Sequence, residues 1–265
     1  KRLIQFFEDA MTRDDKDRNG KTVKPLLDTI VEPMAKICEG TSLNERTKSS
    51  VVKFLSDARD PRAMPCFKKV LEDFKVNTNE EDVRWVSRAA KAMELKELSE
   101  PMFKVFTTIK VAEPKAATIY RDVHDAVLAL ATPAYEATCI SLLEKTVDKA
   151  GDMKTLKNEL FWQITAAEIL GKLKSEKAIR PLMKAVLSPS KADVAATAVS
   201  ALIKIGKPAI GPASELLAGN DKELVEYSTL ENVKGAAGTD GKIPEAAKKA
   251  AEKAHVQTAA IILAT

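Results

Sequence analysis

The chain has 265 residues, of which 45% are hydrophobic and 30% are charged, and its 42 basic and 38 acidic side chains leave a net charge of +4. Only 10 residues are Gly and 5% are aromatic, while Ala, Leu, Lys and Glu predominate, which favours an all-α fold over a β-rich one. The basic excess is weaker than that of a typical nucleic-acid-binding protein, and no apolar run approaches the ~20 residues that a membrane span needs.

The N-terminal segment, residues 1–21, is predicted to be a cap helix followed by a turn. Two candidate helices, Leu3–Thr12 and Val23–Cys38, flank a short charged stretch that is rich in Asp, Asn and Gly. These residue types favour turns because their side chains or backbones adopt turn conformations at low cost.

This charged stretch matches the first half of a calcium-binding loop, D-x-D-x-N-G. Asp15, Asp17 and Asn19 stand at positions one, three and five, and Gly20 allows the sharp turn, which is the pattern that a hard cation needs. Position twelve of such a loop is a bidentate Glu, and here it is Leu26. The residues therefore predict at most a weak calcium site, with a plain charged turn as the alternative, and no other cofactor is predicted.

The middle and end of the chain repeat one pattern of small and large apolar residues. It is clearest in Thr165–Leu187 and again in Thr197–Leu217: two small or β-branched residues, a large apolar residue three positions later, a short turn, and a Pro that opens the next helix. The first small residue of each copy, called the anchor below, recurs at steps of 38, 37, 40, 32 and 61 residues. The six anchors are Val51, Ala89, Ala126, Ala166, Ala198 and Ala259.

The last step is too long for one plain repeat. It includes the polar, Gly-rich stretch 235–242, so residues 219–243 are interpreted as a loop insertion, with Ile243 and Pro244 opening the next helix. Steps in the thirties are typical of a two-helix repeat, whose apolar faces are buried only when neighbouring pairs stack.

The paired small residues, the following Leu and the Pro-Leu after the turn resemble bacterial HEAT repeats, including those of bilin-lyase-like proteins. The resemblance covers most of the chain from about Thr22 and is best over Phe161–Leu217. The Asp and Val-Arg of such repeats occur at Asp82-Val83-Arg84. The resemblance implies an all-α, right-handed α-α superhelix of about six helix pairs over residues 1–265, with the second helix of each pair lining a concave face.

Three cysteines, Cys38, Cys66 and Cys139, are separated in sequence and form no CxxC motif, so neither a zinc site nor a redox motif is predicted. Each lies in a helical apolar context, where a free thiol behaves as a small hydrophobe. This weakly favours a reducing, cytoplasmic compartment. Because the chain starts at Lys1 and stops in the apolar run Ala259–Ala264, a processed fragment of an exported protein remains the alternative.

No catalytic residue is predicted. The sequence has no HExxH, GxSxG, Walker or GxGxxG motif, and its two histidines, His124 and His255, are far apart. Trp85 and Trp162 stand four residues before an anchor. They are interpreted as packing residues between repeats, with an aromatic platform for a peptide or a base as the alternative.

Outward positions of the expected second helices are basic in the first half of the chain and more neutral later. A basic groove could hold an acidic peptide or a phosphate backbone, and a solvated surface is the alternative. The residues predicted to bind a partner are Lys48, Lys53, Arg84, Arg88, Lys91, Arg121 and His124.

These observations favour a non-enzymatic scaffold or adaptor that binds a protein or peptide, with an acidic one fitting the basic positions. A nucleic-acid-binding protein similar to the HEAT-like alkylpurine DNA glycosylases is the alternative, and it would need a catalytic Asp beside Trp85 or Trp162. A bilin-lyase-like enzyme is a further alternative that depends on the repeat resemblance alone.

Overall fold

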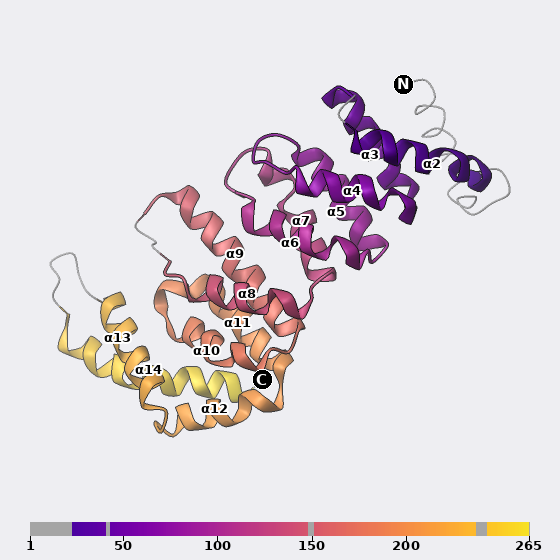
Figure 1. Ribbon diagram of the computed structural model, residues 1–265. Coiled ribbons are helices and arrows are strands. Elements are labelled where there is room, and N and C mark those ends of the chain that lie inside the picture. Colours follow the sequence, from indigo (N-terminus) through magenta and orange to yellow (C-terminus); the bar gives the residue numbers. More distant parts are fainter. Residues whose placement is uncertain (1–22, 41–42, 148–150, 237–242, 265) are drawn as a thin grey trace. The chain divides into compact units, whose positions relative to one another are not determined.

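The computed structural model describes residues 23–40, 43–147, 151–236 and 243–264 (Figure 1). These residues form thirteen α-helices joined by turns and six single-turn 3₁₀ helices, and they contain no β-strand. The all-α fold predicted from composition is therefore confirmed. The predicted cap at 1–21 and the calcium residues Asp15, Asp17 and Asn19 lie outside the described residues.

The chain divides into two compact units, 1–130 and 131–265. The helices of the first unit are α2 (Val23–Glu39), α3 (Glu45–Ala58), α4 (Met64–Glu72), α5 (Glu80–Ala92), α6 (Ser99–Thr108) and α7 (Tyr120–Ala129). Those of the second unit are α8 (Glu136–Glu144), α9 (Met153–Lys172), α10 (Ile179–Leu187), α11 (Ala192–Ile205), α12 (Lys207–Leu217), α13 (Lys222–Ala236) and α14 (Glu245–Ala264).

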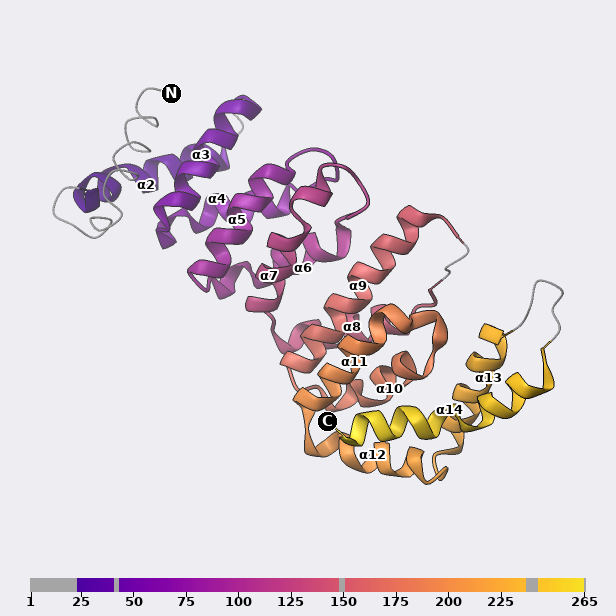
Figure 2. The ribbon, with the colours of Figure 1, turned by 180° about the vertical axis from the view of Figure 1, so that it is seen from behind.

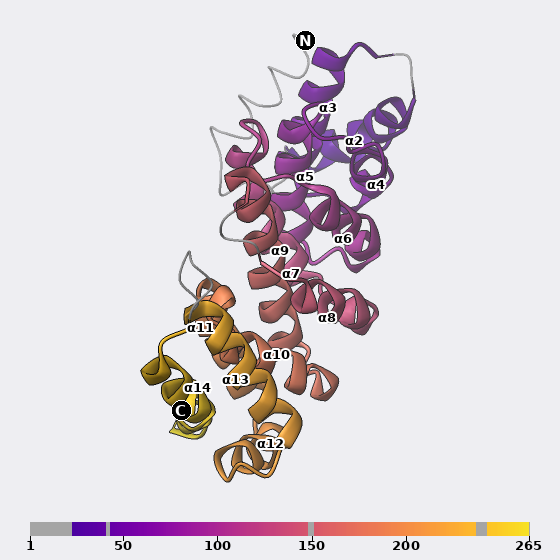
Figure 3. The same cartoon turned by 90° about the vertical axis from the view of Figure 1, so that its left-hand side faces the viewer.

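The first unit has two layers of helices. Helices α2, α4 and α6 pack against one another in order, and α3, α5 and α7 form the second layer, as Figure 3 shows from the side. In the second unit α8 packs on α10 and α9 packs on α11, while α14 lies against α12 and α13 (Figure 2). Each unit therefore repeats a two-helix element.

All six anchors lie on α3, α5, α7, α9, α11 or α14, and all are buried. The large apolar residue that follows is also buried in four copies, at Leu55, Leu130, Leu170 and Leu202. Small side chains let two helices approach closely, and the larger residue fills the layer that they share. The periodic pattern thus predicts buried positions on these helices.

Local sequence signals explain where several helices begin. The side chain of Asn44 accepts a hydrogen bond from the Thr47 N–H at 3.0 Å at the start of α3, and Asp152 does the same for Thr155 at 2.9 Å before α9. Pro65 lies in the first turn of α4, where its missing N–H costs no helical hydrogen bond. Polar capping and proline therefore separate elements whose apolar patterns would otherwise run together.

The expectation of a loop insertion at 219–243 is wrong for most of that range. Residues 222–236 form helix α13, which packs on α14 and α10, and only 237–242 lie outside the described residues. The helix was missed because its apolar residues are spread around it and do not form one stripe, whereas the neighbouring Gly-rich stretch is typical of loops. The expected helix start after Pro244 is confirmed, because α14 begins at Glu245.

The expectation of three free thiols is also wrong. Cys38 of α2 and Cys66 of α4 form a disulfide with a Cα–Cα distance of 5.4 Å, across a sequence separation of 28 residues. Cys139 is a free, buried cysteine, and burial raises the pKa of its thiol to about 12. A buried disulfide is typical of an oxidising compartment, so the argument for a reducing one fails.

Within the described part of the chain, no single helix combines the length and the apolar composition needed to cross a membrane. Two bent helix pairs, Tyr120–Ala129 with Pro133–Glu144 and Glu176–Leu187 with Pro189–Ile205, meet the length and composition criterion together.

Candidate functional site

The outer side of α3, α5 and α7 carries a group of cations around one tryptophan. The Trp85 ring, half-buried on α5, has Lys53 Nζ at 5.6 Å from its centroid, Arg84 Cζ at 5.4 Å and Arg88 Cζ at 5.6 Å. Lys53 comes from α3, so Trp85 lies at the seam between successive second helices. These distances are within the range of cation–π attraction.

Carboxylates of α7 complete this surface. Arg88 Nε donates to Asp122 at 2.9 Å, Arg84 Nε lies 3.4 Å from the same carboxylate, and Lys91 Nζ lies 2.7 Å from Asp125. The hydrogen bond that Lys91 donates to Asp125 is the main reason why the pKa of Asp125 is lowered. We call this surface the charged face; its residues are Lys53, Arg84, Trp85, Arg88, Lys91, Asp122, His124 and Asp125.

The charged face follows from repeat geometry. Positions 84, 88 and 91 share one side of α5 because they are spaced by four and three residues. Positions 122 and 125 share one side of α7 for the same reason. Arg88 and Lys91 each meet the carboxylate 34 residues further along the chain, which is close to one repeat. Contacts between pairs of the second unit are longer in sequence, such as Lys184 with Glu223 at a separation of 39.

Five of the seven residues predicted to bind a partner therefore meet on the charged face: Lys53, Arg84, Arg88, Lys91 and His124. Arg121 is exposed on α7, one helical turn before Asp125. Lys48 points to the opposite end of α3 and pairs with Asp73 at 3.5 Å. The predicted cations are mostly ion-paired, so the face carries mixed charge and not a uniform positive one.

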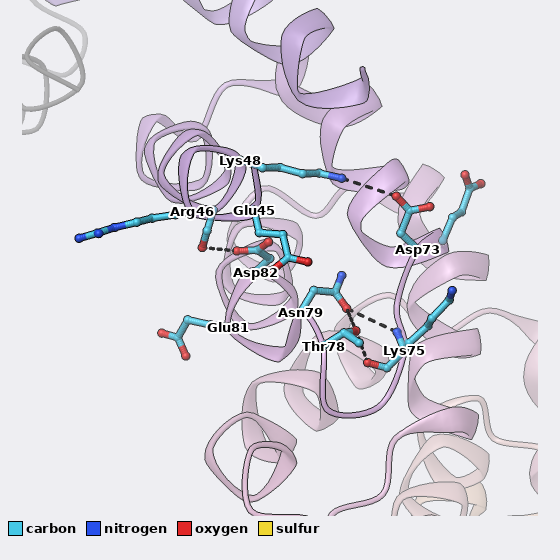
Figure 4. Close-up of a pocket in the computed structure, with 11 residues that line it drawn as sticks. Glu45, Arg46, Lys48, Asp73, Lys75, Thr78, Asn79, Glu81 and Asp82 are labelled. Atoms are coloured by element: carbon cyan, nitrogen blue, oxygen red, sulfur yellow. Dashed lines mark hydrogen bonds and ion pairs between the residues drawn. The ribbon is translucent and has the colours of Figure 1, made fainter. Parts of the chain in front are cut away.

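The Lys48 end of α3 opens into a polar pocket of about 650 Å³ between α3, the end of α4 and the start of α5 (Figure 4). Inside it the Ser49 hydroxyl donates a hydrogen bond to Asp82 at 2.5 Å. In the loop before α5, the Thr78 hydroxyl donates a hydrogen bond to the side chain of Asn79 at 3.1 Å. The pocket is lined by Glu45, Arg46, Lys48, Ser49, Glu72, Asp73, Lys75, Thr78, Asn79, Glu81 and Asp82.

Two carboxylates of this pocket respond differently to their surroundings. Burial raises the pKa of Asp82, and the negative charges of Glu81 and Glu45 add to this increase, although the Ser49 hydrogen bond opposes it. Partial burial also acts to raise the pKa of Asp73, but the hydrogen bond and charge of Lys69 outweigh it and leave that pKa lowered. The folded protein therefore disfavours the charged form of Asp82 and favours the charged form of Asp73.

We predict that Asp82→Asn changes how stability depends on pH. Because the folded protein binds the Asp82 proton more tightly than the unfolded chain does, the wild type loses stability as the pH rises from about 4 through the raised pKa. The variant lacks this loss, so its free energy of unfolding relative to wild type increases between about pH 4 and pH 7. Urea unfolding across this range measures the difference.

The matched control is Asp73→Asn. Its carboxylate has a lowered pKa and contributes stability that is present at neutral pH and lost in acid, so this variant falls below wild type as the pH rises. Equal pH slopes for wild type and Asp82→Asn contradict the burial argument.

Trp162, the second tryptophan of the repeat frame, is half-buried on α9 with Lys145 Nζ at 5.8 Å from its ring. It lies in the second unit and does not belong to the charged face. Sequence reasoning missed the acidic members of the face, Asp122 and Asp125. Opposite charges one repeat apart on successive second helices were the available signal.

Across the described ranges, no group of three or more His, Cys, Asp or Glu side chains is arranged to hold a metal ion. No protein-family model matches the sequence, and no curated protein is significantly similar to it.

Proposed function

We propose that the chain is a HEAT-type α-solenoid that serves as a protein–protein interaction scaffold, with the charged face as its partner-binding surface. The observation that carries this proposal is a half-buried Trp flanked by two Arg on a continuous row of helices. Trp and Arg are enriched among the residues that dominate protein–protein binding energy.

The mixed charge of the face favours a protein over a nucleic acid. A phosphate backbone brings a dense row of negative charges, and the carboxylates of Asp122 and Asp125 would repel it. A protein surface can instead offer carboxylates to Arg84 and Arg88 and cations to the two aspartates. The stacked pairs support the scaffold because arrays of this kind present long surfaces built from equivalent positions.

The test is affinity capture with a variant that removes the Trp85 and Arg88 side chains, Trp85→Ala with Arg88→Ala. The proposal predicts that partners recovered with wild type fall by at least about tenfold, as expected for loss of hot-spot residues. The matched control is reversal of the exposed lysines Lys248, Lys249 and Lys253 on α14 to Glu, which leaves recovery unchanged. Equal recovery with all three proteins contradicts the assignment of the face.

Retention on DNA at low salt tests the nucleic-acid alternative. The proposal predicts no retention. Binding to DNA that weakens steeply as salt increases would instead favour the alternative.

A further inference from the structure

Helix α12 exposes two large apolar residues and two charged residues to solvent. Its inner residues Ala209, Ala213 and Leu216 are buried, and the helix packs mainly on α14 (Figure 2). On its outer side Ile210 is 54% exposed and Leu217 is 39% exposed. Scattered exposed apolar residues are ordinary, but these two lie on the same flank, one on each side of the helix midpoint.

The charges of α12 oppose its own dipole. Lys207 is the first residue of the helix and Glu215 lies in its last turn, while the first turn has no acidic residue and the last turn no basic one. A helix prefers the reverse arrangement, because its N-terminus carries partial positive charge and its C-terminus partial negative charge. Among the described residues, neither side chain has an ion-pair partner. Something other than the stability of α12 itself is needed to explain this placement.

Gly211 stands midway between these two charges, on the same outer side. A Cβ added there meets no atom of another element within 4 Å, so no neighbouring helix covers this position. Gly in a helix interior costs up to about 1 kcal/mol relative to Ala. Its absent side chain leaves space for another backbone to approach.

We propose that α12 is the centre of a homodimer interface, in which α12 of a second copy packs antiparallel on it around a two-fold axis beside Gly211. The eight-residue spacing of Lys207 and Glu215 spans about 12 Å along the helix. In an antiparallel pair centred on Gly211, Lys207 of each copy meets Glu215 of the other. Each charge then also faces the end of the opposite helix that it favours.

An apolar groove borders the same arrangement. It has a volume of about 250 Å³ and lies between the end of α11, the start of α12 and α14, with Lys207, Ile210 and Ile262 among its lining residues. Because Lys207 of one copy meets Glu215 of the other, the C-terminal end of the second copy's α12 lies beside this groove. A second copy is therefore the occupant that matches the charges of α12 and borders the groove.

Charge exchange tests this arrangement. Wild type, Lys207→Glu and Glu215→Lys are compared by sedimentation equilibrium, alone and as a 1:1 mixture of the two variants. We expect a wild-type dimer that weakens by about tenfold or more in each single variant, because each reversal turns two attractive pairs into repulsive ones. The mixture is expected to form a dimer again, since both contacts of the mixed pair then join opposite charges.

Controls separate this result from a folding defect. Both reversals are on exposed residues and each improves the match of charge to the α12 dipole, so the melting temperature of each variant at high dilution should equal or slightly exceed that of wild type. Lys249→Glu on α14 should leave the dimer unchanged. A wild-type chain that stays monomeric at high concentration overturns the proposal. So does a dimer that is unaffected by the single reversals, or a mixture that fails to restore it.

Discussion

Removing the Cys38–Cys66 disulfide is expected to lower the free energy of unfolding by about 3–4 kcal/mol. The bond closes a loop whose ends are 28 residues apart, and the restriction that such a loop places on the unfolded chain has about this magnitude. Cys38→Ala/Cys66→Ala is the variant of choice, because both sulfurs are fully buried and alanine adds no polar group there. Chemical unfolding of wild type and variant measures the loss.

Reductant gives an independent readout of the same bond. Dithiothreitol should lower the melting temperature of wild type toward that of the double variant and should leave the double variant unchanged. Cys139→Ala is the control, because Cys139 is a free thiol: this variant should remain as sensitive to reductant as wild type. Three reactive thiols in the unreduced, unfolded wild type would contradict the disulfide.

The disulfide also has a structural consequence that sequence spacing could not show. It joins α2 to α4, the first helices of two successive pairs. Leu27, Val31 and Ala35 continue the buried stripe of α2 toward Cys38. In sequence these cysteines are small apolar residues at core positions, and only the packing of neighbouring pairs brings them within bonding distance. Such pairing depends on the stacking of repeats and not on any local motif.

The parts of the fold that the sequence predicts are the helices in which small and large apolar residues recur at a regular spacing. Small anchors such as Ala126 and Ala166, followed by Leu130 and Leu170, mark the second helices because helix–helix contact demands small residues at a fixed spacing. The parts that could not be predicted lack a period. Helix α13 has no single apolar stripe and stands next to a Gly-rich stretch, so composition favoured a loop.

The candidate site was predicted in part for the same reason. Outward cations such as Arg88 and Lys91 could be placed on one helix side from their spacing. Their carboxylate partners, Asp122 and Asp125, lie on the next second helix, and a contact between helices requires the register of stacking, which one sequence pattern does not fix. The spacing alone therefore predicts a basic surface, whereas the face carries mixed charge because the neighbouring pair supplies two carboxylates.

A second large effect on stability is expected at Gly171, where α9 and α11 approach closely. A Cβ added at this position would lie 2.7 Å from Ala201 Cα and 2.9 Å from Ala201 Cβ. Because the nearer atom is backbone, a larger side chain is accommodated only if the two helices move apart. Overpacking of this kind typically costs 1–3 kcal/mol, so Gly171→Val is expected to lower the free energy of unfolding by about 3 kcal/mol.

Gly211→Val is the matched control, since it makes the same substitution in a helix where the added Cβ meets nothing within 4 Å. Unfolding of both variants is measured at high dilution, so that association of copies does not contribute. We expect the Gly211 variant to lose clearly less stability than Gly171→Val, because its added side chain meets no other helix and only its local contact with Pro212 changes. If Gly171→Val is equally neutral, the two helices do not meet at this seam. A large loss confined to Gly171 shows instead that close contact between successive second helices stabilises the second unit.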